Sequence, residues 1–398
     1  MNQTAISQRK LLGIAGLGWL FDAMDVGMLS FLMAALQKDW NLTASQVGWI
    51  GSVNSIGMAV GALAFGLLAD RIGRKNVFIF TLLLFSLGSG LSALTTTLAA
   101  FLALRFLIGM GLGGELPVAS TLVSEAVPAK DRGRAVVLLE SFWAGGWLLA
   151  ALISYFVIPA YGWRTALWLS ALPALYAIYL RLRLPDSPRF MAAKKEGTVW
   201  GNIANVWSAP YRKETTMLWI LWFCVVFSYY GMFLWLPSVM VMKGFSLIKS
   251  FEYVLVMTLA QLPGYFSAAW LIERAGRKFV LITYLLGTAA SAYFFGTAES
   301  LAGLMAAGIF LSFFNLGAWG ALYAYTPEQY PTSIRATGAG MAAAFGRIGG
   351  IFGPLFVGSL VAKGVSVTAI FTLFCLSVLV AVLSVTVLGK ETKQQELA

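Results

Sequence analysis

The stretch "GLLADRIGRK" at residues 66–75 returns as "AWLIERAGRK" at residues 269–278, an offset of 203 positions. A second motif, "EAVPAKDR" at residues 125–132, returns as "EQYPTSIR" at residues 328–335 with the same offset. Two separate motifs that share one offset indicate that the second half of the chain duplicates the first. The sequence therefore predicts two structurally equivalent halves, related as a parallel repeat.

The composition around these motifs is that of a membrane protein. Of the 398 residues, 59% are hydrophobic and 11% are charged, and the mean hydropathy is +0.79. A soluble domain would carry roughly a quarter charged residues. Apolar runs of about 20 residues fit helices that cross roughly 30 Å of hydrocarbon. The sequence predicts an all-α membrane protein with twelve transmembrane helices, in two six-helix pseudo-symmetric bundles. The predicted helices are 11–36, 47–68, 77–97, 99–121, 135–158, 165–181, 215–241, 251–272, 279–297, 301–324, 338–362 and 365–388.

The predicted domains are an N-terminal bundle at 1–181, a cytoplasmic linker at 182–214 and a C-terminal bundle with a short cytoplasmic tail at 215–398. With both termini in the cytoplasm, 21 of the 28 Lys and Arg residues lie in cytoplasmic segments and five in external loops, as the positive-inside rule requires. Membrane topology thus explains the net charge of +11 without a nucleic-acid partner. The chain has no histidine, and Cys224 and Cys375 both lie in apolar runs, so we expect no disulfide, metal site or cofactor.

Two acids stand inside the first apolar run, "GWLFDAMDVGMLSF" at residues 18–31. Asp22 and Asp25 are three positions apart and share a helix face. Arg105 in the fourth helix lies at about the same depth, counted at roughly 1.5 Å per residue. A charge at mid-bilayer costs about 2.5–3.5 kcal/mol or more and therefore faces a partner or a water-filled path. These residues predict a proton-coupling cluster; a static ion pair that only fixes packing is the alternative.

Three further charges fall inside predicted helices. Glu140 and Glu115 are candidates for a second proton site, and the alternative is a carboxylate that reaches the cytoplasmic interface. Arg347 lies near the midplane in "AGMAAAFGRIGGIFGPLF", where small residues leave room for a ligand. A guanidinium there suits a substrate carboxylate through bidentate hydrogen bonds. Structural pairing of Arg347 with the acids of the first half is the alternative.

Aromatic and amide side chains in the helices complete the predicted substrate site. Aromatic rings would stack on a flat ligand, although membrane aromatics more often face lipid. The aromatic candidates are Trp143, Trp147, Tyr229, Tyr230, Trp319 and Tyr323. Asn315 and Gln261 are amides in apolar helices, so each is expected either to bind a ring nitrogen or to hydrogen-bond across helices.

These motifs resemble those of a known family. "GLLADRIGRK" resembles the signature loop between helices 2 and 3 of the major facilitator superfamily, and "RFLIGMGLGG" at 105–114 resembles its helix 4 signature. "LPDSPRF" at 184–190 is similar to the motif after helix 6 of sugar and organic-ion porters. "GWLFDAMDVG", "GMGLGGELPVASTLVSE" and "YFVIPAYGWR" resemble bacterial niacin permeases, which are related to synaptic vesicle proteins. The resemblance implies the major facilitator fold, an acid on helix 1 that works with an arginine on helix 4, and a basic helix 11 residue for organic anions.

The resemblance also implies an inner latch at the repeated loops, which would hold the halves closed when the cavity opens outward. A basic loop patch that serves only topology is the alternative. The candidate gating residues are Asp70, Arg74, Glu125 and Arg132, mirrored by Glu273, Arg277, Glu328 and Arg335.

The expected function is proton-coupled import of nicotinate, or nicotinamide, by alternating access in a bacterial cytoplasmic membrane. The expected partners are this small anion, protons and membrane lipid, and the resemblance implies a monomer. Another small aromatic anion, such as a benzoate-like acid, is the alternative substrate. The residues offer no nucleophile–base pair and no phosphate loop, so we expect no enzyme activity. The predicted linker is too short for the soluble output domain of a sensor.

Overall fold

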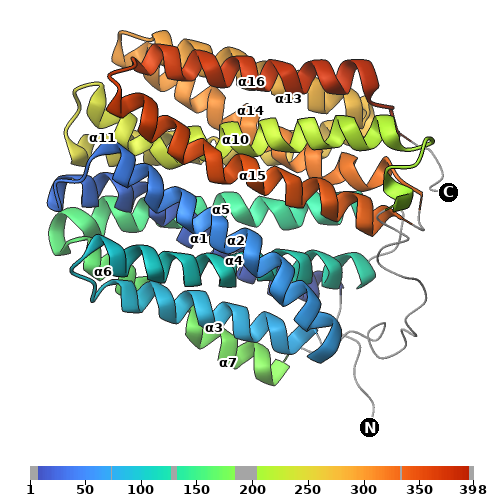
Figure 1. The fold of residues 1–398 in the computed structure, drawn as a ribbon, viewed down its shortest axis with the longest axis horizontal. Helices are drawn as coiled ribbons and strands as arrows, with labels where there is room; N and C mark the ends of the chain where they lie inside the picture. Colours follow the sequence, from blue (N-terminus) through green and yellow to red (C-terminus); the bar gives the residue numbers. More distant parts are fainter. Residues whose placement is uncertain (1–7, 73, 127–131, 184–203, 332–333, 394–398) are drawn as a thin grey trace. The chain divides into compact units, whose positions relative to one another are not determined.

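The computed structural model describes residues 8–72, 74–126, 132–183, 204–331 and 334–393, and within them all regular secondary structure is helical. Figure 1 shows long helices joined by short turns. The helices are α1 (Gln8–Asp39), α2 (Ala44–Ile72), α3 (Arg74–Ser92), α4 (Leu98–Ala126), α5 (Arg132–Tyr161), α6 (Trp163–Leu169), α7 (Pro173–Arg183), α10 (Arg212–Met242), α11 (Leu247–Leu259), α12 (Gln261–Ala275), α13 (Arg277–Thr297), α14 (Leu301–Glu328), α15 (Arg335–Ala362) and α16 (Val367–Leu388).

The sequence offset reappears in the helix boundaries. α2 begins at Ala44 and α11 at Leu247, which are 203 residues apart, and α3 and α13 begin with the same separation. The starts of α4 and α14, and of α5 and α15, repeat at this offset as well. The repeated motifs therefore mark equivalent ends of equivalent helices.

The structure differs from two of the predicted helices. The run at 165–181 is divided, because α6 ends at Leu169 and α7 begins at Pro173. Proline has no amide hydrogen to continue a helix, but it fits the first helical position. The run at 251–272 is also interrupted, since α11 ends at Leu259 and α12 begins at Gln261. Pro263 cannot donate to the carbonyl of Leu259, which explains the break.

Ten helical spans of the described part are long and apolar enough to cross a membrane, with α11 and α12 counted together as Leu247–Ala275. Their outer faces carry large hydrophobic side chains that are mostly exposed, for example Leu63, Phe156 and Val387. Such a surface would be unfavourable in water and suits hydrocarbon. Of the remaining helices, α4 contributes a shorter apolar stretch at Leu98–Gly114.

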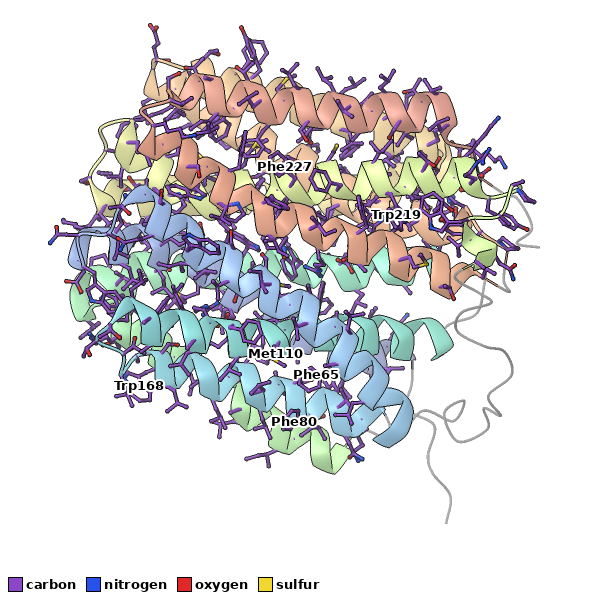
Figure 2. All side chains as sticks on the ribbon, viewed as in Figure 1. Phe65, Phe80, Met110, Trp168, Trp219 and Phe227 are labelled. Carbon is purple, nitrogen blue, oxygen red and sulfur yellow. The ribbon has the colours of Figure 1, made fainter. Side chains whose placement is uncertain are left out.

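The first of two compact units contains the described residues within 1–28 and 56–194. Its helices approach closely where glycine removes the side chain. A Cβ on Gly61 of α2 would meet the backbone of Met110 in α4. The rings of Phe65 and Phe80 pack nearby with centroids 5.6 Å apart (Figure 2). This backbone contact holds α4, and with it Arg105, against α2.

The second unit contains the described residues within 29–55 and 195–398. Its α10 packs against α15 and α16. The ring of Phe227, labelled in Figure 2, lies 5.4 Å from that of Phe356 and 5.2 Å from that of Phe374. The end of α1 belongs to this unit. The hydroxyl of Ser30 donates to the carbonyl of Phe233 at 2.8 Å, and these two residues are 203 positions apart. Equivalent positions of the two repeats therefore meet here.

Candidate functional site

A buried ion pair joins α1 to α4 in the first unit. Nη2 of Arg105 donates to Oδ2 of Asp25 at 2.7 Å, and the two side chains are 0% and 1% exposed. The hydroxyl of Ser89 on α3 donates to the other carboxylate oxygen of Asp25. Buried ion pairs persist when further hydrogen bonds satisfy the carboxylate, and Ser89 supplies one. The predicted pairing of an α1 acid with Arg105 is therefore present, and Asp25 makes it.

Asp22 lies one turn before Asp25 and is also buried. Between this turn and α5, the ring of Trp19 lies 4.9 Å from that of Trp143. Glu140 stands one turn before Trp143 on α5 and is 1% exposed. The proximity of Trp19 was not anticipated from the sequence. Its position three residues before Asp22, on the same helix face, is the sequence signal that would have indicated it.

The remaining candidate on α5 in the first unit is Trp147, which is buried. It lies against α1, since a Cβ added to Gly27 would contact its side chain. The structure thus groups several predicted residues on facing surfaces of α1 and α5. Glu115 lies outside the described side chains. The same is true of the gating candidates Asp70, Arg74, Glu125, Arg132 and Arg335.

The second unit holds an aromatic cluster beside a cation. Nη1 of the half-buried Arg347 donates to the hydroxyl of Tyr230 at 3.3 Å. The ring of Tyr230 lies 5.2 Å from that of Tyr229, which in turn lies 4.8 Å from that of Trp319. Both tyrosines and the tryptophan are buried. Four residues from α10, α14 and α15 that the sequence predicted are therefore connected in one series of contacts.

Trp222 and Tyr323 extend this cluster. The indole of Trp222 donates to the hydroxyl of Thr326 at 2.9 Å, and its ring lies 5.1 Å from that of Tyr323. Trp222 was not predicted from the sequence. Trp222 stands seven residues before Tyr229 and therefore shares a face of α10 with it. This spacing is the sequence signal that would have indicated Trp222.

Two buried amides differ in their surroundings. Asn315 stands one turn before Trp319 on α14 and is 1% exposed. Gln261 begins α12 at the helix break and is fully buried, and its amide has no hydrogen-bond partner among the described residues. Gln261 has no hydrogen bond or ring contact with the aromatic cluster in the described structure. The sequence treated the two amides alike, whereas the structure places only Asn315 on the same helix as Trp319, one turn before it.

The repeated loop of the second unit forms a charged cluster. Nη1 of Arg277 donates to Glu273 at 2.9 Å, and its Nε donates to Glu328 at 3.1 Å. Three of the four predicted gating residues of this unit are therefore brought together at the start of α13. In the part of the chain that the structure describes, no group of three or more His, Cys, Asp or Glu residues is arranged to hold a metal ion.

The segment after α16 completes this cluster and was not anticipated. The carboxylate of Glu391 accepts the backbone N–H groups of Arg277 at 2.9 Å and Lys278 at 3.0 Å, at the N-terminus of α13. This position favours a negative charge. Lys390 pairs with Glu214 of α10, and Thr392 donates to Glu328 at 2.5 Å. The segment thus connects α10, α13 and α14.

Tyr330 lies beside this charged cluster, and the negative charge of Glu214 affects its pKa. The hydroxyl of Tyr330 shares a hydrogen bond of 2.9 Å with that of Thr215. Burial raises the pKa of the Tyr330 phenol, the Thr215 hydrogen bond opposes this shift, and the negative charge of Glu214 adds to it. Tyr330 therefore stays protonated and joins the loop after α14 to the start of α10.

Comparison with known proteins agrees with this architecture. The family model of the Major Facilitator Superfamily matches residues 15–267 and 253–397. The chain is 70% identical over 397 residues to the putative niacin/nicotinamide transporter NiaP of Bacillus subtilis, with 99% of each chain covered. It is 47% identical over 419 residues to the niacin transporter NiaP of Acinetobacter baylyi, covering 97% of this chain and 95% of the relative.

A solved structure shows the same fold. The crystal structure of a D-xylose-proton symporter matches with a TM-score of 0.80 at 20% identity, covering 97% of this chain and 99% of the other. The resemblance to facilitators of the niacin permease type is confirmed, and the named relatives are transporters rather than enzymes. This chain, a multi-pass and all-helical membrane protein, belongs to the Major Facilitator Superfamily.

Proposed function

We propose that this protein imports nicotinate, and also nicotinamide, across a bacterial cytoplasmic membrane. The observation that carries the proposal is the contact of Arg347 with Tyr230, continued by the rings of Tyr229 and Trp319. A guanidinium at one end of an aromatic surface suits a flat ring that bears a carboxylate. The names of the two niacin-transporting relatives support the same substrate class.

The proposed topology has twelve membrane spans in two halves, with both termini in the cytoplasm and alternating access as the mechanism. In this assignment α4 is the fourth span, α6 and α7 together form the sixth, and α11 and α12 form the eighth. The offset of 203 residues between the helix starts of the two halves supports it. The domain limits 1–181, 182–214 and 215–398 remain the sequence prediction.

Proton coupling is assigned to the acids of α1. The pair of Asp25 with Arg105 holds a carboxylate in a position where protonation would release the guanidinium. Protonation of Asp25 would shift the equilibrium between two conformations by as much as its interaction free energy differs between them. Asp22 and Glu140 are additional carboxylates buried in the same unit. Glu115 remains a candidate on sequence grounds, and the monomeric state is part of the proposal.

The test is uptake of labelled nicotinate by purified protein in liposomes, with and without an inward acid gradient. We expect accumulation that depends on the gradient and is competed by unlabelled nicotinate and nicotinamide. Liposomes without protein and an uncoupler that collapses the gradient are the controls. Uptake of benzoate without uptake of nicotinate would replace the proposal by the alternative substrate. Uptake of nicotinate that ignores the gradient would remove the proton coupling and leave the substrate assignment.

A further inference from the structure

The aromatic cluster ends in polar atoms that have no hydrogen-bond partner among the described residues. Trp319 is 3% exposed, and its Nε1 is buried without a hydrogen-bond partner among the described residues. Oδ1 of Asn315 is also buried and has no hydrogen-bond partner among the described residues. The two residues are four positions apart on α14 and therefore share a helix face. One small region thus presents an indole donor beside an amide.

The neighbouring tryptophan shows that this region is able to satisfy an indole. Trp222 lies in the same cluster, with its ring 6.4 Å from that of Trp319, and its Nε1 donates to Thr326. A buried donor without an acceptor is costly, and hydrocarbon offers no water to replace one. An indole N–H only donates, so the missing group at Trp319 is an acceptor.

The position of this donor relative to the cation defines the missing group. Arg347 contacts Tyr230, Tyr229 follows, and Trp319 lies at the other end of the series. A ligand that places its carboxylate at Arg347 and its ring along the tyrosines directs the far edge of the ring toward Trp319. The pyridine nitrogen of nicotinate stands meta to the carboxylate, in the half of the ring away from it, and it is unprotonated at neutral pH and accepts a hydrogen bond.

We propose that Nε1 of Trp319 donates to the pyridine nitrogen of the substrate and that Asn315 assists it. The inference rests on the proposed function and adds the residues that recognise the ring nitrogen of the substrate. The oxygen and nitrogen of an amide are exchanged by a half-turn, so Asn315 is able to offer its NH₂ group as a second donor. A benzene ring leaves both groups unpaired, which is how a polar site rejects an analogue that lacks the hydrogen-bonding atom.

Two selectivity ratios separate the two ends of the site. The ring ratio is the apparent affinity for a pyridine compound divided by that for its benzene analogue, taken for nicotinate over benzoate and for nicotinamide over benzamide. Each affinity is measured by competition with labelled nicotinate uptake. The charge ratio is the apparent affinity for nicotinate divided by that for nicotinamide. We expect Trp319→Phe to lower the ring ratio about five- to tenfold, the value of one neutral hydrogen bond, and to leave the charge ratio unchanged. Asn315→Leu is expected to lower the ring ratio in the same direction.

Trp222→Phe is the matched control, because it removes an indole of the same cluster whose donor is already satisfied. It is expected to leave the ring ratio unchanged. Arg347→Gln, assayed with labelled nicotinamide, is expected to change the charge ratio and leave the nicotinamide-to-benzamide ratio unchanged. Thermal melting of each variant verifies folding, and Asn315→Leu provides the test if Trp319→Phe does not fold.

The outcomes distinguish this inference from the proposed function. A wild-type protein that transports nicotinate, with the same ring ratio in Trp319→Phe and Asn315→Leu, overturns the ring assignment and leaves the function intact. A wild-type protein with no preference for pyridine over benzene rings also overturns it. A wild-type protein that transports neither nicotinate nor nicotinamide overturns the proposed function first.

Discussion

Arg105 and Asp25 form an ion pair of 2.7 Å between α4 and α1, and neither side chain is more than 1% exposed. Removing one partner of a buried pair leaves an uncompensated charge, which costs about 3–5 kcal/mol. Replacing both partners removes that charge. The pair is therefore accessible to a test that separates its role in stability from its role in coupling.

For this pair we expect Asp25→Asn to lower the melting temperature and to abolish gradient-driven accumulation, while exchange of labelled for unlabelled substrate continues. The double variant Asp25→Asn with Arg105→Gln should recover much of the stability and none of the accumulation. Ser89→Ala keeps the charges and removes one hydrogen bond, so it is the mild control. Full gradient-driven uptake by both Asp22→Asn and Asp25→Asn would show that the acids have only a structural role.

The second prediction concerns Arg347 and its substrate group. Arg347→Gln removes the charge and keeps a polar, shorter side chain. Because a hydrogen bond to a charged group contributes about 1.5–3 kcal/mol, the apparent affinity for nicotinate should fall about 10- to 100-fold. The affinity for nicotinamide should change little. Competition curves against labelled nicotinamide measure both values, and equal losses for the two ligands would place the carboxylate elsewhere.

The third prediction concerns the segment after α16. Glu391 accepts two backbone N–H groups at the start of α13, so Glu391→Gln should lower the free energy of unfolding by about 1 kcal/mol. Glu252→Gln is the matched control, because Glu252 pairs with Lys249 at 2.8 Å on an exposed surface, where such pairs contribute little. Thermal melting in detergent compares the two variants. An equal effect of both substitutions would contradict the assigned role of Glu391.

Gly276→Ala tests the same contact from the other side. Gly276 has a φ of 97°, and an added Cβ would meet the Glu391 carboxylate. Both the strained backbone and the displaced carboxylate predict a loss of stability at least as large as that of Glu391→Gln. A Gly276→Ala protein that melts like the wild type would show that the carboxylate does not occupy this position.

The fourth prediction compares two glycines in helices. Gly61→Ala places a Cβ against the backbone of Met110 and should cost about 1–3 kcal/mol or more. Gly340→Ala meets nothing within 4 Å in α15 and should stabilise the helix by about 0.5–1 kcal/mol. Melting temperatures of the two variants should therefore move in opposite directions. A shift of the same sign and size in both would show that helix propensity alone decides their effect.

Much of the fold was readable in the sequence because membrane helices are built from local rules. The repeats at 66–75 and 269–278 gave the offset that reappears in the helix starts. The length of apolar runs gave most of the helices, because backbone groups in hydrocarbon must be satisfied within the helix. The break at Pro173 was missed, since proline is tolerated in some membrane helices and a hydrophobicity pattern does not record which ones it interrupts.

The candidate site was readable as a set of residues but not as an arrangement. The sequence named Asp22 and Asp25 together, and the structure gives the ion pair with Arg105 to Asp25. The sequence treated Asn315 and Gln261 as equivalent amides, whereas in the structure Asn315 stands one turn before Trp319 on α14 and Gln261 stands at the helix break that begins α12. It gave no sign of Glu391 at α13, because a contact between residues more than 100 positions apart leaves no local pattern.

The sequence by itself determined that this chain is a helical membrane protein with a duplicated plan, and that charges stand at depths where they require partners. Burial in hydrocarbon imposes these features on each segment separately, so they can be read one segment at a time. Only the tertiary structure decided which partner each charge takes, and that the indole of Trp222 has an acceptor whereas that of Trp319 has none among the described residues. Those outcomes depend on how helices rotate and approach one another, and packing between distant segments sets that geometry.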